Sequence, residues 1–201
     1  MLTSSYSKLV SGFMENEIDS LKDIHDNITD QYDTIVEQLL HIKGKLIFMG
    51  VGKSGLIGRK LAATFSSTGT PSFFVHATES VHGDLGMIDK NDTVILISNS
   101  GETKEILAPL KSLNIIGVHT IAFTGNENSS LAKSCDSTLI IHVDKEADKL
   151  NLAPTNSSTA VLVVGDALAC TISELKDFTK DDFAIFHPGG ALGKKLLAEK
   201  A

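Results

Sequence analysis

Five short apolar runs, separated by helical patterns, constrain this chain more than any other feature of its sequence. The runs show little alternation of apolar and polar residues, as expected where both faces of a parallel sheet are covered. Alternating β and α units predict an α/β fold, a flavodoxin-like three-layer αβα sandwich with a five-stranded parallel sheet and right-handed crossovers. The predicted strands lie at 46–49, 72–75, 93–97, 117–123 and 138–143.

The chain has 201 residues, enough to bury a full core, and we expect a single domain over 1–201. Residues 1–43 are predicted to form N-terminal helices that pack on the core. Residues 44–201 are predicted to form the α/β sandwich and the C-terminal helices. The predicted helices lie at 5–25, 30–42, 56–67 and 157–175, with a short one capped by Thr179–Asp182.

Charge and hydropathy narrow the classes of partner. The net charge of −7 argues against nucleic acid and anionic membranes, which need clustered Lys and Arg. No apolar run approaches the ~20 residues of a membrane span, and the N-terminus lacks a basic segment followed by an apolar one. Cys135 and Cys170 are predicted as buried free thiols of a reducing compartment. We therefore expect a cytoplasmic protein.

The segment 98–103 forms a predicted strand-to-helix turn that carries three hydroxyls and a glycine. Such a turn presents backbone N–H groups at the positive end of a helix dipole. Ser98, Ser100 and Thr103 add donors of adjustable direction, so the turn suits a phosphate monoester. An ordinary Ser/Thr helix cap would use the same residues.

The segment 50–55 matches G-x-G-x-x-G, which raises the question of a nucleotide site. A dinucleotide fold also wants an acidic residue at the end of the second strand, which here ends in Val75-His76. A P-loop is excluded because Ile47 stands where its first glycine should be. Lys53 and Ser54 therefore favour a small anionic ligand.

Three loops with unusual chemistry are predicted at the same edge of the sheet: 50–55, 76–84 and 98–103. In an open parallel sheet, ligands bind beyond the carboxyl ends of the strands, near a switch in strand order. We therefore expect these loops to form the walls of a phosphate-type site.

Together these motifs closely resemble the sugar isomerase (SIS) domain family, and within it the arabinose-5-phosphate isomerases. The resemblance covers nearly the whole chain, and the order of its segments is highly specific. It rests on 50–55 continuing to 76, on 82–87 with 98–103, and on 152–155 with 187–193.

This resemblance implies interconversion of D-arabinose 5-phosphate and D-ribulose 5-phosphate through a cis-enediol, the first step of Kdo and lipopolysaccharide biosynthesis. It implies no required cofactor and a homo-oligomer, most simply a tetramer with shared active sites. Many family members carry C-terminal CBS regulatory domains, which we do not expect in a chain that stops soon after 187–190. Two alternatives are an isomerase of another phosphosugar and a non-catalytic sugar-phosphate-binding regulator.

The resemblance also assigns roles to residues. It implies catalytic roles for Lys53, Glu105, Glu146 and His187, with Glu79 competing for the role of carbon base. It implies substrate or phosphate binding by Ser54, Gly69, Thr70, His82, Ser98, Ser100 and Thr103. His187 is hypothesised to reach the site of a neighbouring subunit, and His76 to hold an inhibitory, non-essential zinc. From its sequence context alone, Glu146 belongs to a solvated run of charges.

Overall fold

The computed structural model describes residues 5–190 and 195, and its centre is a five-stranded, all-parallel sheet. The strand order is β2-β1-β3-β4-β5, which confirms the predicted fold class. The chain moves outward from β1 to β2 and then returns to β3 on the other side, so the switch in strand order lies between β1 and β3. The strands are β1 (Leu46–Gly50), β2 (Ser72–His76), β3 (Thr93–Ile97), β4 (His119–Thr124) and β5 (Ser137–Ile140).

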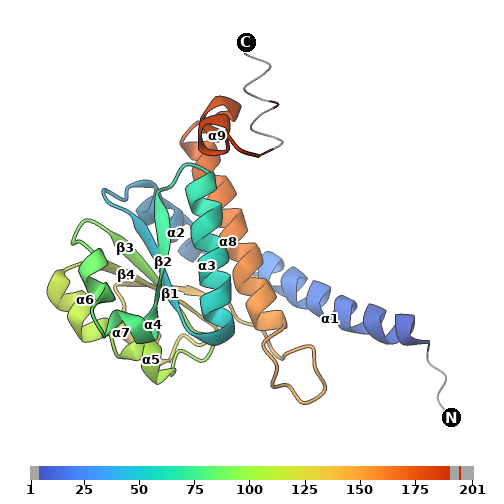
Figure 1. Cartoon of the computed structure of the whole chain (residues 1–201). Helices are drawn as coiled ribbons and strands as arrows, with labels where there is room; N and C mark the ends of the chain where they lie inside the picture. Colours follow the sequence, from blue (N-terminus) through green and yellow to red (C-terminus); the bar gives the residue numbers. More distant parts are fainter. Residues whose placement is uncertain (1–4, 191–194, 196–201) are drawn as a thin grey trace.

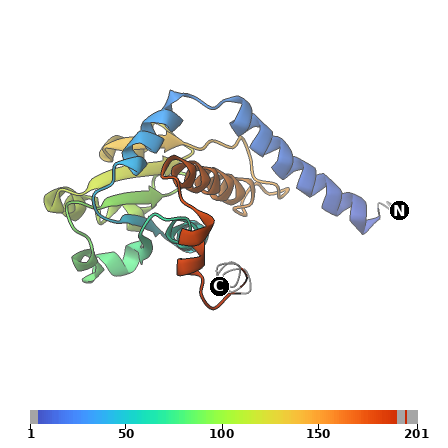
Figure 2. The ribbon, with the colours of Figure 1, turned by 90° about the horizontal axis from the view of Figure 1, so that it is seen from above.

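Helices cover both faces of the sheet, as Figures 1 and 2 show. One face packs against α2 (Asp30–Leu40), α3 (Gly52–Ser67) and α8 (Asn156–Leu175). The other carries α4 (Ala77–Ser80), α5 (Lys104–Leu107), α6 (Leu110–Ile116) and α7 (Ser130–Ser134). The remaining elements are α1 (Tyr6–Asp26), α9 (Lys180–Phe186) and a short 3-10 turn, η1 (Asp84–Met87).

Successive residues of β1, β3 and β4 contribute to two separate cores, one on each face of the sheet. Phe48 of β1 belongs to the core beneath α3 and α8, where its ring lies 5.4 Å from that of Phe65. Its neighbours Ile47 and Met49 belong to the core beneath α4 to α7. Both sets are fully buried, which is why the strand sequences show no polar alternation.

Several element boundaries differ from the predictions. The helical pattern after the turn 98–103 is split into α5 and α6, because Pro109 caps the second helix. Helix α3 begins at Gly52 rather than at 56. Strand β5 ends at Ile140, which leaves a long connection to α8. The capping box at Thr179 is confirmed. Cys170 is exposed, so the prediction of its burial was wrong.

Helix α8 meets the length and composition of a membrane span, with a mean hydropathy of 1.4 over its most apolar window. Its inner face, however, places Ala160, Val164, Leu168 and Ile172 in the core beneath the sheet. The spacing of these residues is that of an amphipathic helix packed on one side. The apolar character of α8 is thus accounted for in part by its packing in the protein core.

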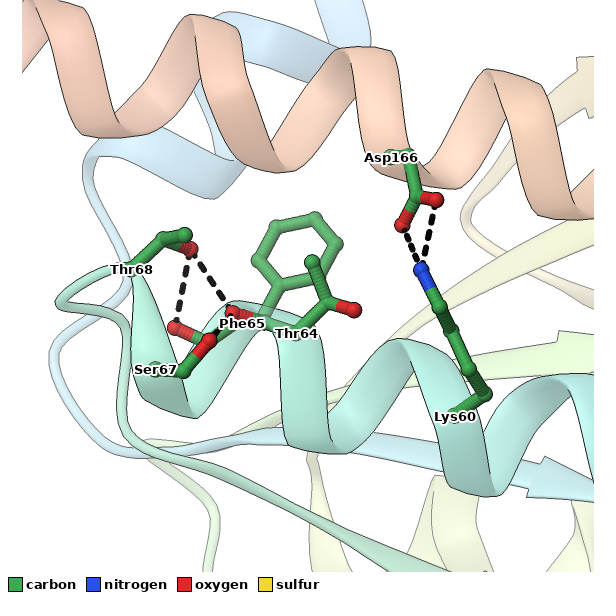
Figure 3. Close-up of polar contacts among 6 residues, drawn as sticks. All are labelled: Lys60, Thr64, Phe65, Ser67, Thr68 and Asp166. Carbon is green, nitrogen blue, oxygen red and sulfur yellow. Dashed lines mark hydrogen bonds and ion pairs between the residues drawn. The ribbon is translucent and has the colours of Figure 1, made fainter. Parts of the chain in front are cut away.

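Figure 3 shows how α3 and α8 lie against each other. Gly165 of α8 allows the close approach, because a Cβ there would come within 2.5 Å of the Leu61 side chain. Lys60 pairs with both carboxylate oxygens of Asp166 at the solvent side of this contact. Their side chains are 45% and 39% exposed, so the pair contributes on the order of 1 kcal/mol or less. Close packing, rather than this ion pair, holds the two helices together.

Candidate active site

A cavity of about 430 Å³ opens at the carboxyl ends of β1 and β3, at the switch in strand order. Its volume is in the range typical of small-molecule sites. Three segments wall it: the start of α3, the turn after β3, and the connection from β5 into α8. The polar and charged side chains that line it are Ser54, Ser98, Asn99, Ser100, Thr103, Asp144, Lys145, Glu146, Asn151, Ser157 and Ser158.

The first wall is the N-terminus of α3, which lies directly after β1. Gly50 and Gly55 make this tight turn, since a Cβ on Gly50 would lie 2.8 Å from the Gly55 nitrogen. Ser54 lines the cavity, and Lys53 is exposed in the same first helical turn. A 16-residue helix that begins at the cavity provides free N–H groups and the positive end of its dipole. This wall suits an anion.

The second wall is the hydroxyl turn, 98–103. Ser98 Oγ lies 2.9 Å from Thr103 Oγ1 and accepts a hydrogen bond from the Gly101 nitrogen at 3.1 Å. Only one of the two paired hydroxyls can donate to the other, so the second keeps a hydrogen that it can donate to a ligand. Ser100 is exposed on the same wall. The predicted grouping of Ser98, Ser100 and Thr103 with Ser54 is present in the structure.

Glu102, in the same turn, serves a different purpose. Its carboxylate accepts a hydrogen bond from the Ser130 nitrogen at 2.7 Å, at the start of α7. This backbone hydrogen bond, followed by one from the Ser130 side chain, lowers the pKa of Glu102 below its usual value. Glu102 therefore anchors the turn to α7 and is not among the residues that line the cavity.

The third wall places the Glu146 carboxylate on the N-terminus of α8. It accepts hydrogen bonds from the backbone nitrogen and hydroxyl of Thr155 at 2.8 and 3.1 Å. It also accepts from the Ser157 nitrogen at 3.2 Å and from the Ser157 hydroxyl. Partial burial by itself would raise the pKa of Glu146, but these hydrogen bonds outweigh it and the pKa is lowered. Glu146 is thus an oriented, ionised carboxylate at neutral pH.

Backbone hydrogen bonds also fix the segment around Glu146. The Glu146 nitrogen donates to Asn151 Oδ1 at 2.6 Å, and the Ala147 nitrogen donates to the Thr155 hydroxyl at 2.8 Å. The Asp148 carboxylate accepts from three backbone nitrogens of the same loop. A sequence that resembles a solvated charge run is therefore an ordered loop.

Thr155 and Ser157 hold the Glu146 carboxylate, and the sequence analysis did not single them out. Thr155 is the N-cap of α8 and Ser157 lies in its first turn. Their hydroxyls at a helix start were a recognisable capping signal. A capping signal does not reveal that these residues bind the carboxylate of Glu146, which lies nine positions before Thr155.

The segment 76–84 was predicted as a third wall, but it does not line the cavity of the single chain. The segment 143–158 takes that place. Strand β2 is the edge strand, so its carboxyl end lies one strand away from the switch between β1 and β3. Glu79 and His82 are exposed there.

Other predicted site residues also lie outside the cavity lining, Lys53 among them. Glu105 is exposed on α5, the short helix that begins directly after the hydroxyl turn. His76 ends β2, and within the described part of the chain its Nδ1 is buried without a hydrogen-bond partner. The described residues contain no group of three or more potential metal ligands, and the zinc at His76 stays a prediction.

Gly69, Thr70 and His187 lie at the opposite edge of the sheet. A Cβ on Gly69 would come within 2.5 Å of the Phe178 ring, and Lys176 donates to the Thr70 hydroxyl at 3.1 Å. These contacts dock the start of β2 against the link between α8 and α9. Figure 1 shows α9, which ends just before His187, at the far end of α8 from the Glu146 loop. Within one chain, these three residues do not reach the cavity.

Comparison with known proteins agrees with this architecture. A family model described as the SIS domain matches residues 38–171. The chain belongs to the SIS domain family. Its cavity is therefore a site built within an SIS domain, at the carboxyl edge of that domain's parallel sheet.

Two curated relatives of this SIS-domain chain share about half of its residues. One, named arabinose 5-phosphate isomerase KdsD, from Shigella flexneri, is 52% identical over 181 residues, covering 90% of this chain and 55% of the relative. The protein of the same name from Francisella tularensis is 48% identical over 199 residues, covering 98% of this chain and 61% of the relative. The chain thus spans little more than half the length of these relatives.

A solved structure is similar to this chain, and the match covers the full length of the solved chain. It is a protein of E. coli CFT073 in complex with arabinose 5-phosphate, with 55% sequence identity and a TM-score of 0.91. The match covers 94% of this chain and 100% of the other. The similarity therefore extends over a whole chain of comparable size.

Proposed function

We propose that this chain is an aldose–ketose isomerase that interconverts D-arabinose 5-phosphate and D-ribulose 5-phosphate through a cis-enediol. The observation that carries the proposal is the Glu146 carboxylate, held ionised at a cavity whose other walls suit a phosphate. The arabinose 5-phosphate isomerases named above support this substrate, as does the complex of the E. coli protein with that sugar phosphate.

The phosphate would bind between the start of α3 and the hydroxyl turn. Ser54, Ser98, Ser100 and Thr103 supply hydroxyl donors there, and the exposed Lys53, next to Ser54 in the first turn of α3, would supply positive charge. A phosphate held away from the reacting carbons fixes the sugar relative to the opposite wall. That wall carries Glu146.

Glu146 would act as the carbon base. In the aldose-to-ketose direction it removes the proton from C2, giving the cis-enediol, and the proton is delivered to C1. A second group moves a proton from the oxygen on C2 to the oxygen on C1. Of the three glutamates proposed for the carbon base, Glu146 lines the cavity, whereas Glu79 and Glu105 do not. Its depressed pKa keeps it in the basic form.

We further propose a homo-oligomer, a tetramer with shared sites, in which His187 serves the cavity of a neighbour. Helix α1 exposes Leu9, Val10, Phe13, Met14 and Ile18, and Figure 2 shows it projecting from the body, so it offers an apolar surface to another copy. The Phe183 carbonyl accepts a hydrogen bond from His187 Nδ1 at 2.8 Å. In the neutral ring the hydrogen therefore lies on Nδ1, and Nε2 is the nitrogen that can accept a proton.

Subunit mixing tests this arrangement. Lys53→Ala and His187→Ala proteins are each expected to lose most of their activity. Mixed under conditions that exchange subunits, they should regain part of it, because some sites would combine an intact Lys53 with an intact neighbouring His187. Native mass spectrometry verifies the exchange. No recovery in verified mixed oligomers contradicts the shared site.

We also propose that the product enters Kdo and lipopolysaccharide biosynthesis, that catalysis requires no cofactor, and that the protein is cytoplasmic. No role is assigned to a nucleic acid or a membrane.

Turnover measured by NMR tests the proposed function. The purified protein is incubated with ribulose 5-phosphate, arabinose 5-phosphate, a hexulose phosphate and, as a control, unphosphorylated arabinose. We expect interconversion of the two pentose phosphates and no reaction of the free sugar. Turnover of the hexulose phosphate alone would assign another phosphosugar. Binding without turnover of any compound would leave a sugar-phosphate-binding regulator.

A further inference from the structure

We propose that Asn156 is a positioning residue for Glu146, because its buried amide ties the backbone beside Glu146 to α1 and to the start of α8. Asn156 is the first residue of α8 and is 1% exposed. Its Nδ2 lies 2.9 Å from the Lys145 carbonyl, 2.7 Å from Asn16 Oδ1 and 2.9 Å from Ser20 Oγ. The inference rests on the proposed function in that Glu146 is the carbon base.

The hydrogen bonds determine how the amide is oriented. The Lys145 carbonyl can only accept, so the NH2 group of Asn156 faces it. Within the described part of the chain, this leaves Asn156 Oδ1 buried without a partner. An unpaired buried oxygen costs about as much free energy as one or two good hydrogen bonds contribute. The amide therefore adds little net stability, and its main effect is to fix geometry.

The geometry that it fixes is the clamp on Glu146. Lys145 immediately precedes Glu146, while Thr155 and Ser157, which donate to its carboxylate, flank Asn156. One amide thus joins the backbone that carries the carboxylate to the helix turn that carries its donors. Without it, the two sides of the clamp are joined by the hydrogen bonds of the carboxylate itself and by the one from the Ala147 nitrogen to the Thr155 hydroxyl.

The same amide links the clamp to α1. Helix α1 contains no buried residue; Leu21 and Ile24 pack against the core that includes Ala160 of α8, and hydrogen bonds add to this contact at the start of α8. One hydrogen of the Asn156 amide faces the Lys145 carbonyl, Asn16 Oδ1 and Ser20 Oγ share the other, and Glu17 accepts from the Thr159 hydroxyl at 2.8 Å. The position of α1 is therefore coupled to that of Glu146 through Asn156, whereas Thr159 holds α1 without contacting Lys145.

Charged groups around the clamp come from several elements. The loop itself carries Asp144, Lys145, Asp148 and Lys149, of which the first two line the cavity with Glu146. Helix α1 contributes Glu17, and the start of α3 contributes Lys53 beside the cavity-lining Ser54. Asn156→Ala leaves all these charges in place, so a change in the titration of Glu146 reports the geometry of its donors.

The test uses Asn156→Ala and Asn16→Ala, with Thr159→Val as the matched control. The titration of the Glu146 carboxyl is followed by 13C NMR in the resting protein, with Glu146→Gln used to assign the signal. We expect its pKa to rise toward the usual value in Asn156→Ala, and by less in Asn16→Ala. Thr159→Val should titrate as the wild type does. These measurements need no substrate, so they stand whether or not the protein turns over a phosphosugar.

Kinetics give the second readout. Asn156→Ala should lower kcat by roughly 10-fold, because the base is held less accurately. KM should change little, since the phosphate-binding walls are untouched, and Tm should stay close to that of the wild type. A folded Asn156→Ala protein with the wild-type Glu146 titration overturns the inference. So does an equal shift in Thr159→Val, which would assign the effect to α1 docking in general.

Discussion

Replacing Glu146 with glutamine should lower kcat by about 10²–10⁴-fold, the usual contribution of a well-placed acid–base group. Gln keeps the size and one acceptor oxygen of the side chain, so α8 keeps its start, but an amide cannot take the proton from C2. The protein should bind the sugar phosphate nearly as well as the wild type does. Steady-state rates in both directions, with Tm as a check on folding, measure the effect.

The matched control for this change is Glu174→Gln, an exposed glutamate near the other end of α8. It removes the same charge far from the cavity and should leave kcat unchanged. A Glu146→Gln protein that retains wild-type kcat would contradict the assignment of the base. A loss shared equally by Glu174→Gln would point to net charge rather than to proton transfer.

Gly50→Ala should lower both the stability and the activity. The added methyl group would lie 2.8 to 2.9 Å from backbone atoms of Ser54 and Gly55, which cannot rotate away. Forcing β1 and α3 apart should cost about 1–3 kcal/mol of unfolding free energy, the usual cost of overpacking a dense site. It should also move Ser54 from the cavity wall, raising KM for the phosphosugar. Urea unfolding and steady-state kinetics measure the two effects.

Gly12→Ala is the matched control, and it is expected to change the unfolding free energy in the opposite direction. Gly12 lies within α1, and a Cβ there would meet nothing within 4 Å. The change should raise the unfolding free energy by a few tenths of a kcal/mol up to about 1 kcal/mol, since Ala favours the helix. An unfolding free energy unchanged by Gly50→Ala would show that the turn is not packed as tightly as described.

The fold was predictable because its signals are local. Buried parallel strands have a recognisable composition, and the turns after β1 and β3 carry their glycines and hydroxyls in a continuous stretch of sequence. The cavity walls that contain Ser54, Ser98, Ser100 and Thr103 were therefore found from residue patterns. Their common edge of the sheet followed from the parallel topology.

The third wall was not predictable from such patterns. Glu146 lies in a charge run, and only the family resemblance distinguished it from a solvated loop. Its clamp depends on the long connection after β5 folding back onto the start of α8, through contacts between residues nine and eleven positions apart. The segment 76–84 had the more suggestive chemistry, but its edge strand places it outside the cavity.

Solvent exchange at C2 of arabinose 5-phosphate tests the central claim most directly. The wild-type protein and the variants Glu146→Gln, Glu79→Gln and Glu105→Gln are each incubated with the sugar phosphate in D2O. The rate at which deuterium enters C2 is then compared by NMR. We predict exchange with the wild type, and its loss in Glu146→Gln while that variant still binds the sugar phosphate. Exchange at the wild-type rate in Glu146→Gln, with loss in Glu79→Gln or Glu105→Gln, would contradict the account.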